Sequence, residues 1–145
     1  MATEPQAAGL PVAWRIPLLV LGLLSMLAGV GAGLQRLGWA VPLPHDSLAT
    51  VHGPLMVAAF FGTVIGLERA VALGKRWGFA APAACGLGGI ALIAGFPPVV
   101  ALTLTTGGAA LLTSVTLCAA GRQPALHTRL LSLAAALSAV AGVAW

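Results

Sequence analysis

The chain has 145 residues, of which 59% are hydrophobic and only 7% are charged, and its mean hydropathy is +1.02. About a quarter of the residues in a typical soluble domain are charged, so this composition excludes an ordinary soluble protein and indicates an integral membrane protein. The formal net charge of +4 comes from seven basic residues against three acidic ones, with no basic run interleaved with aromatic residues. We therefore expect a lipid bilayer as the surroundings and no nucleic-acid partner.

The first 13 residues are mostly small or polar, and they are predicted to form a disordered leader ahead of a single transmembrane domain, residues 14–145. The first predicted helix covers residues 16–35, an uncharged stretch that is long for the core of a signal peptide. Small residues recur in it every three or four positions, which predicts a ridge that another helix can approach closely. The ridge consists of Gly22, Ser25, Gly29 and Gly33.

The second predicted helix covers residues 48–73, and from Ser47 to Leu67 it has 21 residues without a formal charge. About 20 apolar residues cross the hydrocarbon core of a bilayer, so this stretch is predicted to span it. Asp46 or Ser47 is expected to cap its N-terminus. The helix contains one histidine, His52, and an ionisable residue inside a membrane is a functional-site hypothesis by default.

The second half of the chain is predicted to form three more helices. No residue from Gly78 to Gly121 is charged, and the adjacent Pro97 and Pro98 divide this run because proline interrupts a helix. The predicted helices cover residues 77–94, 98–120 and 126–145. The predicted fold is therefore an all-α bundle of five transmembrane helices. Because the last helix would end at the last residue, we also consider that the chain is a fragment or a shortened relative of a larger membrane protein.

The lysines and arginines are distributed unevenly over the predicted loops. With a cytoplasmic N-terminus, only Arg36 falls on the outer side, and six basic residues fall on the inner side. The positive-inside rule then predicts an N-in, C-out, multi-pass protein of the inner (cytoplasmic) membrane of a bacterium. The inner residues are Arg15, Arg69, Lys75, Arg76, Arg122 and Arg129.

His52 and Met56 form the sharpest local pattern in the chain. They are four residues apart, so a regular helix would place both on one face. Imidazole and thioether groups together suit haem iron or copper. His45, seven residues before His52, is a further metal-ligand candidate if its loop folds inward. The alternative interpretation is that His52 is a buried residue hydrogen-bonded to a neighbouring helix and that Met56 fills space.

Glu68 and Arg69 end the uncharged stretch of the second helix. Adjacent residues on a helix point about 100° apart, so we expect them not to pair with each other. Glu68 is either a proton-relay carboxylate or, as we prefer, an interface anchor paired with a more distant cation such as Lys75 or Arg129.

Two cysteines and a group of hydroxyl residues complete the polar groups within the predicted helices. Cys85 and Cys118 lie on different predicted helices, so a disulfide between them is not expected. The hydroxyl residues of the fourth helix are expected to bond back to their own helix. They are Thr103, Thr105, Thr106, Thr113, Ser114 and Thr116.

The stretch from Thr50 to Ala59 follows an apolar helix and a loop with Trp and Pro, and it continues into a glycine-rich segment. It resembles the start of the NnrS family, haem- and copper-containing membrane proteins linked to nitric oxide metabolism. The resemblance covers about residues 14–73, and the matching positions are His52, Met56 and Phe61-Gly62. The stretch is more loosely similar to the haem-ligand helix of haem-copper oxidase subunit I, where only His52 carries over.

Two hypotheses of function follow. In the first, which the resemblance implies, the protein binds haem or copper through His52, with Met56 as a second ligand or neighbour, and acts in nitric oxide or redox metabolism. In the second, it is a cofactor-free helical membrane subunit, transporter-like or an assembly partner, in which His52 is structural. A homo-oligomer that brings two copies of His52 to one haem is a variant of the first. No hydrolase or nucleotide-binding motif is present in the sequence, and whether the protein is an enzyme is left open.

Overall fold

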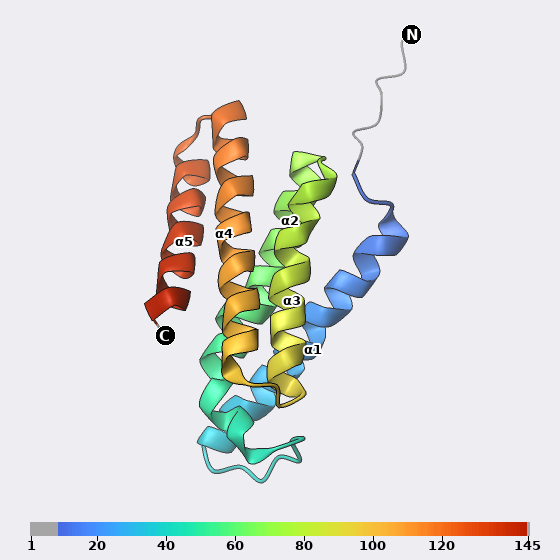
Figure 1. The fold of residues 1–145 in the computed structure, drawn as a ribbon, viewed down its shortest axis with the longest axis vertical. Helices are drawn as coiled ribbons and strands as arrows, with labels where there is room; N and C mark the ends of the chain where they lie inside the picture. The colour runs from blue at the N-terminus through green and yellow to red at the C-terminus, as the bar shows by residue number, and fades with distance from the viewer. Residues whose placement is uncertain (1–8, 145) are drawn as a thin grey trace.

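The computed structural model describes residues 9–144, which form a bundle of helices without strands (Figure 1). Five of its helical segments are long and apolar enough to cross a membrane. The predicted all-α fold with five such helices is therefore confirmed. The first eight residues of the predicted leader and the terminal Trp145 lie outside the described residues.

The helix bounds lie close to the predicted ones. Helix α1 begins at Val12, four residues before the predicted start. The observed ends of α4 and α5 lie within two residues of the predicted ends. The Pro97-Pro98 pair separates α3 from α4, as expected. The elements in order are α1 (Val12–Arg36), η1 (Asp46–Val51), η2 (Pro54–Phe61), α2 (Gly62–Leu73), η3 (Arg76–Phe79), α3 (Ala80–Ile93), α4 (Pro98–Arg122) and α5 (Leu126–Ala144).

The second span differs from the regular α-helix that the sequence predicted. It starts as the 3₁₀-helix η1, continues after His52 and Gly53 as the π-helix η2, and becomes α-helical only at Gly62. The physical reason lies at Pro54, which has no N–H to donate to the carbonyl four residues earlier. A π-helix is rare and often marks a functional site. The predicted side-chain cap by Asp46 or Ser47 is also wrong, because the residue before η1 is His45 and no side chain caps this end.

The small-residue ridge of α1 is confirmed as a packing surface. A Cβ atom on Gly22 would lie 3.2 Å from Thr63 Cγ2, and one on Gly29 would lie 2.7 Å from Met56 Sδ. Ser25, between them, is fully buried against Gly89 of α3. The ridge therefore brings the second span and α3 close to the α1 backbone, as small residues do between membrane helices.

Helices α3 and α4 also approach each other through glycines. A Cβ atom on Gly108 of α4 would lie 2.5 Å from Cys85 Sγ and 3.0 Å from the Cys85 backbone nitrogen. Helix α5 then packs against α4 at the edge of the bundle (Figure 1). As a result, α4 is the main neighbour of α5 among the described helices.

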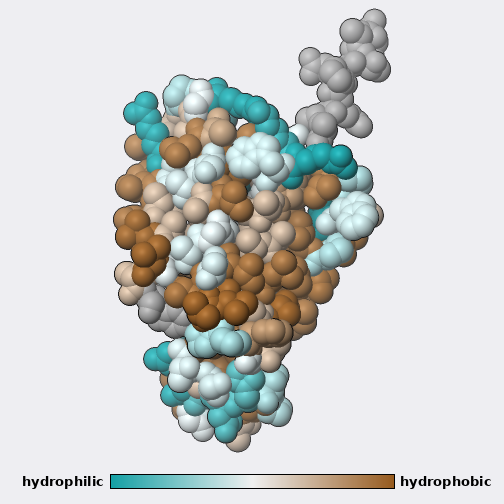
Figure 2. All heavy atoms as spheres, in the orientation of Figure 1, coloured by the Kyte–Doolittle hydropathy of each residue, from teal (hydrophilic) through white to brown (hydrophobic). Residues whose placement is uncertain are grey.

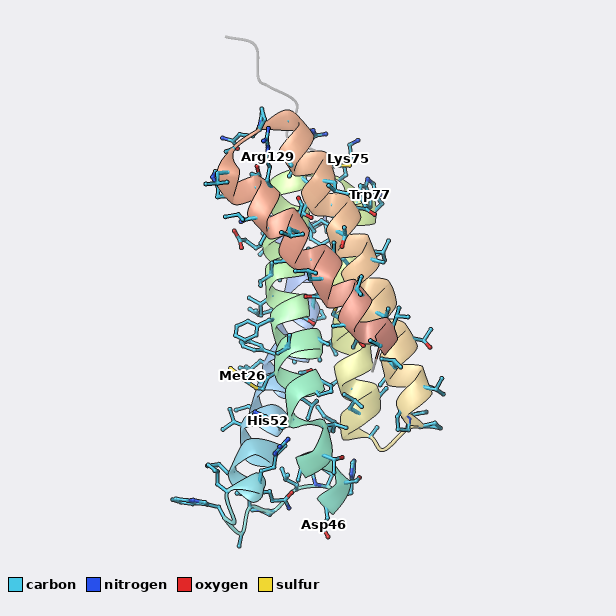
Figure 3. The ribbon with its side chains drawn as sticks, turned by 90° about the vertical axis from the view of Figure 1, so that its left-hand side faces the viewer. Met26, Asp46, His52, Lys75, Trp77 and Arg129 are labelled. Carbon is cyan, nitrogen blue, oxygen red and sulfur yellow. The ribbon has the colours of Figure 1, made fainter. Side chains whose placement is uncertain are left out.

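The two ends of the bundle differ in charge. Figure 3 shows Lys75, Trp77 and Arg129 at one end and Asp46 with His52 at the other. A band of hydrophobic side chains lies between the polar ends (Figure 2). The apolar helices and this band are suited to a lipid bilayer. The end that carries Lys75 and Arg129 is the one that the sequence analysis predicted to face the cytoplasm.

Candidate functional site

His52 lies against α1 near the end of the bundle that carries Asp46 (Figure 3). Its Nδ1 is 2.7 Å from the carbonyl oxygen of Gly29. Since a carbonyl oxygen only accepts, Nδ1 carries the proton and donates it, and the lone pair of the neutral ring is on Nε2. The ring packs on Gly33, where a Cβ atom would lie 2.9 Å from His52 Cε1. The imidazole therefore joins the second span to α1 by both a hydrogen bond and a close contact.

Met56 faces the same helix one turn further along. Its sulfur packs on Gly29, whose carbonyl accepts the bond from His52. His52 and Met56 thus share a face, as predicted, although the π-helix and not a regular α-helix carries Met56. Both side chains contact α1, which is the arrangement expected of residues that pack one helix against another.

His45 has different neighbours from His52. Its Nδ1 is 2.6 Å from the hydroxyl of Ser47, and its Nε2 lies beside Gly95, at the turn between α3 and α4. That Nε2 is buried and has no hydrogen-bond partner among the described residues. These contacts hold His45 at the turn between α3 and α4. They do not support the inward fold of the loop that a joint site with His52 would need.

These positions do not form a haem pocket or a closed copper site within one chain. Within residues 9–144, no three histidine, cysteine, aspartate or glutamate side chains are grouped as a metal site would need. The large cavity of the molecule lies on the opposite side of the second span, and neither His52 nor Met56 lines it. A haem bound through His52 Nε2 would lie outside this cavity.

The cavity is a groove that opens sideways between the second span, α4 and α5, and we call it the lateral groove. Its volume is about 650 Å³. The walls come from Gly53 to Ile65 on the second span and from Leu131 to Gly142 on α5, and α4 forms the floor from Ala101 to Thr116. Most of the lining side chains are apolar, so the groove suits an apolar occupant.

Most hydroxyl groups of α4 add little polarity to this groove, because they donate to carbonyls of their own helix. Thr105 Oγ1 donates to the Ala101 carbonyl at 2.9 Å, and Thr116 Oγ1 donates to the Thr113 carbonyl at 2.9 Å. The predicted back-bonding is confirmed for these residues and for Thr103, Thr113 and Ser114. The prediction is wrong for Thr106, which lines the groove where α5 packs on α4 at Gly142 and whose buried Oγ1 has no hydrogen-bond partner among the described residues.

Glu68 and Arg69 correct a second prediction. They form a salt bridge with each other, with Arg69 Nη2 2.8 Å from Glu68 Oε1. The side chains are long and flexible enough to bend toward each other although their Cβ atoms diverge. Glu68 is 65% exposed, and Arg69 Nε is buried with no hydrogen-bond partner in residues 9–144. The pair lies in the last two turns of α2, at the end of the bundle that carries Lys75 and close to where the lateral groove ends at Ile65.

The two cysteines are not joined. Cys85 is buried between α3 and α4, and Cys118 is exposed on α4, and both are free, as predicted. His127, in the first turn of α5, is exposed at the end of the molecule opposite to His52. None of these three residues is placed to form a binding site together with His52.

One comparison with known proteins identifies the family. A family model described as Domain of unknown function (DUF8744) matches residues 15–145. The chain belongs to this family. The match includes the second span with His52 and the whole of the lateral groove. No curated protein and no solved structure matches the chain, so the contacts of the described residues carry the argument about function.

The lateral groove is the feature that the sequence analysis missed. Its lining residues come from helices up to 89 positions apart, Gly53 to Gly142, and none of them is chemically distinctive. The available signals were the small residues that hollow it, such as Gly53, Ala58 and Ala134. Small residues also mark close helix packing, so the sequence alone does not separate the two.

Proposed function

We propose that this protein is a cofactor-free, multi-pass subunit of a bacterial cytoplasmic membrane, with His52 as a structural residue. Its working surface is the lateral groove, which receives an apolar chain from the bilayer. Assembly with a partner protein or transport of that chain are both roles for such a subunit. The observation that carries the proposal is the bond from His52 Nδ1 to the Gly29 carbonyl, which turns the imidazole of His52 toward α1 and away from the groove.

The distribution of charge supports an N-in, C-out orientation. Six basic residues flank the ends of the helices at the Lys75 end, and only Arg36 follows the other end of α1. Labelling of single cysteines with a membrane-impermeant maleimide tests this in intact cells, with Cys85 and Cys118 replaced by alanine. We expect Arg36→Cys to be labelled from outside and Lys75→Cys only after the cells are opened. The reverse result would contradict the orientation.

The structural role of His52 is tested on the purified full-length chain. We expect no Soret absorption and no stoichiometric metal by mass spectrometry. His52→Ala should lower the unfolding temperature, because it removes a hydrogen bond worth about 1 kcal/mol and leaves a space beside Gly33. His127→Ala is the matched control, since that histidine is exposed, and it should have no effect. A Soret band in the wild type that disappears in His52→Ala would overturn the proposal.

The second candidate function is a haem or copper protein of the kind the NnrS resemblance implies, with a role in nitric oxide or redox metabolism. One observation favours it. A histidine that donates its Nδ1–H to a carbonyl keeps its lone pair on Nε2, which is how metal-ligating histidines are usually oriented. Because His52 does not line the lateral groove of its own chain, the haem would bind between two copies, one His52 from each. Such a homo-oligomer should show two chains per haem by mass measurement in detergent.

A further inference from the structure

His45 makes a contact between the start of η1 and the turn that joins α3 to α4. Its Nδ1 lies 2.6 Å from the hydroxyl oxygen of Ser47, and a Cβ atom on Gly95 would lie 3.6 Å from its Nε2. Gly95 has a φ of +73°, a left-handed conformation that favours glycine, so the ring packs on a turn without a side chain. The imidazole therefore joins two segments that are far apart in the chain.

The contacts of this ring fit a neutral imidazole. The bond to Ser47 satisfies Nδ1 in either tautomer, because a hydroxyl group both donates and accepts. Nε2 is buried and has no hydrogen-bond partner within residues 9–144. A protonated ring has an N–H on both nitrogens, so it would bury a charged donor without an acceptor, which costs far more than an unpaired neutral nitrogen. Protonation of His45 therefore favours movement of the ring into water.

The charged groups around His45 favour the same movement. The turn from 94 to 97 has no charged or titratable side chain that could hold a protonated ring in place. Asp46, the next residue, is exposed, so a ring that moves into water has a carboxylate beside it. The other charged or titratable residues at this end are Arg36, which is exposed in the last turn of α1, and His52, whose Nδ1 donates to a carbonyl of α1.

A shift of His45 would be passed to η1 and from there to the second span. The Leu48 N–H donates to the His45 carbonyl at 3.2 Å, so movement of His45 loosens the first turn of η1. A hollow of about 420 Å³ lies between Thr50 and Val51 of η1 and the first residues of α4, which leaves η1 room to move. η1 leads into Gly53, which lines the lateral groove. The movement therefore reaches the end of the groove next to η1.

We propose that His45 is a pH switch, which holds the start of η1 on the turn between α3 and α4 while the imidazole is neutral and releases it when the imidazole is protonated. The contact is present at neutral pH and is lost as the pH falls, in the range where histidine side chains change charge. The switch goes beyond the proposed function, and only the side from which it senses acid, the outer side, rests on the N-in orientation.

Amide hydrogen exchange of the full-length protein in detergent, followed by mass spectrometry at about pH 7 and about pH 5, tests the switch. After correction for the pH dependence of the chemical exchange rate, exchange in residues 45–51 should rise about 10- to 100-fold at the lower pH, because one proton contributes up to about tenfold per pH unit. Peptides from α4 and α5 should not change. Equal exchange at the two pH values, or an equal rise in all helices, would overturn the switch. Both ends of the protein are accessible in detergent, so such a failure would leave the proposed function standing.

Four variants assign the response to one histidine. His45→Gln can still bond to Ser47 but does not titrate, so its exchange should be the same at both pH values. His45→Lys is charged at both values and should exchange at pH 7 as the wild type does at pH 5. His52→Gln and His127→Gln should keep the wild-type response. A response that persists in His45→Gln, a His45→Lys variant that stays protected at pH 7, or a response that disappears in His52→Gln would overturn the assignment to His45.

Discussion

Replacing Gly33 by alanine should disturb the docking of His52 on α1. A Cβ atom there would lie 2.9 Å from His52 Cε1 and 3.0 Å from Nδ1, whereas carbon atoms in ordinary contact are about 3.5–4.0 Å apart. The ring would have to move by roughly 0.5 Å or more, and the 2.7 Å bond to the Gly29 carbonyl would lengthen or break.

The expected change in the unfolding free energy follows from two losses of stability and one gain. Loss of the hydrogen bond costs about 1 kcal/mol, and overpacking at a close contact costs about 1–3 kcal/mol. Alanine in a helix interior recovers about 1 kcal/mol relative to glycine. The net loss of stability is therefore about 1–3 kcal/mol, which lowers the unfolding temperature by roughly 2–10 °C for a chain of this size.

The assay is thermal unfolding in detergent, followed by circular dichroism, beside a matched variant. Gly107→Ala makes the same chemical change in the middle of α4, where the new Cβ atom meets nothing within 4 Å. It should leave the unfolding temperature unchanged or slightly raised. If Gly33→Ala behaves like Gly107→Ala, His52 does not depend on a close approach to α1 and the structural role assigned to it is wrong.

Three further predictions concern the rest of the bundle. Gly108→Ala should destabilise the fold by about 1–3 kcal/mol, since its Cβ atom would meet Cys85 at 2.5 Å, whereas Gly121→Ala, with open space around it, should not; thermal unfolding compares the two. Glu68→Gln should change the unfolding free energy by less than about 1 kcal/mol, because the salt bridge to Arg69 is largely exposed, and a larger loss would indicate a buried role for the carboxylate. Maleimide should label the exposed Cys118 and leave the buried Cys85 unmodified until the protein is denatured, which peptide mass spectrometry can follow.

Much of the architecture was predictable because hydrocarbon imposes strict rules on sequence. Long uncharged stretches must be helical to satisfy their backbone groups, and Pro97-Pro98 can only end one helix and begin another. The ridge of small residues in α1 likewise predicted a close helix contact. These features depend on residues near in sequence, so the linear pattern carries them.

The same local rules did not determine the details of the second span or of its ion pair. Pro54 predicted that one backbone hydrogen bond would be missing, but the sequence did not predict that the chain would form a π-helix there. The pairing of Glu68 with Arg69 depended on side-chain flexibility, which the divergence of adjacent helical positions did not capture. In both cases the backbone or the side chain had more than one local solution.

The sequence by itself determined that the chain forms five apolar helices, that one end carries the cations, and that His52 and Met56 share a face. Only the tertiary structure decided that this face turns to α1 and that a groove opens on the other side of the same span. The reason is that helical periodicity places residues on a face without stating which neighbour covers it. That neighbour is set by contacts between residues far apart in the chain, such as His52 with Gly29 and Cys85 with Gly108.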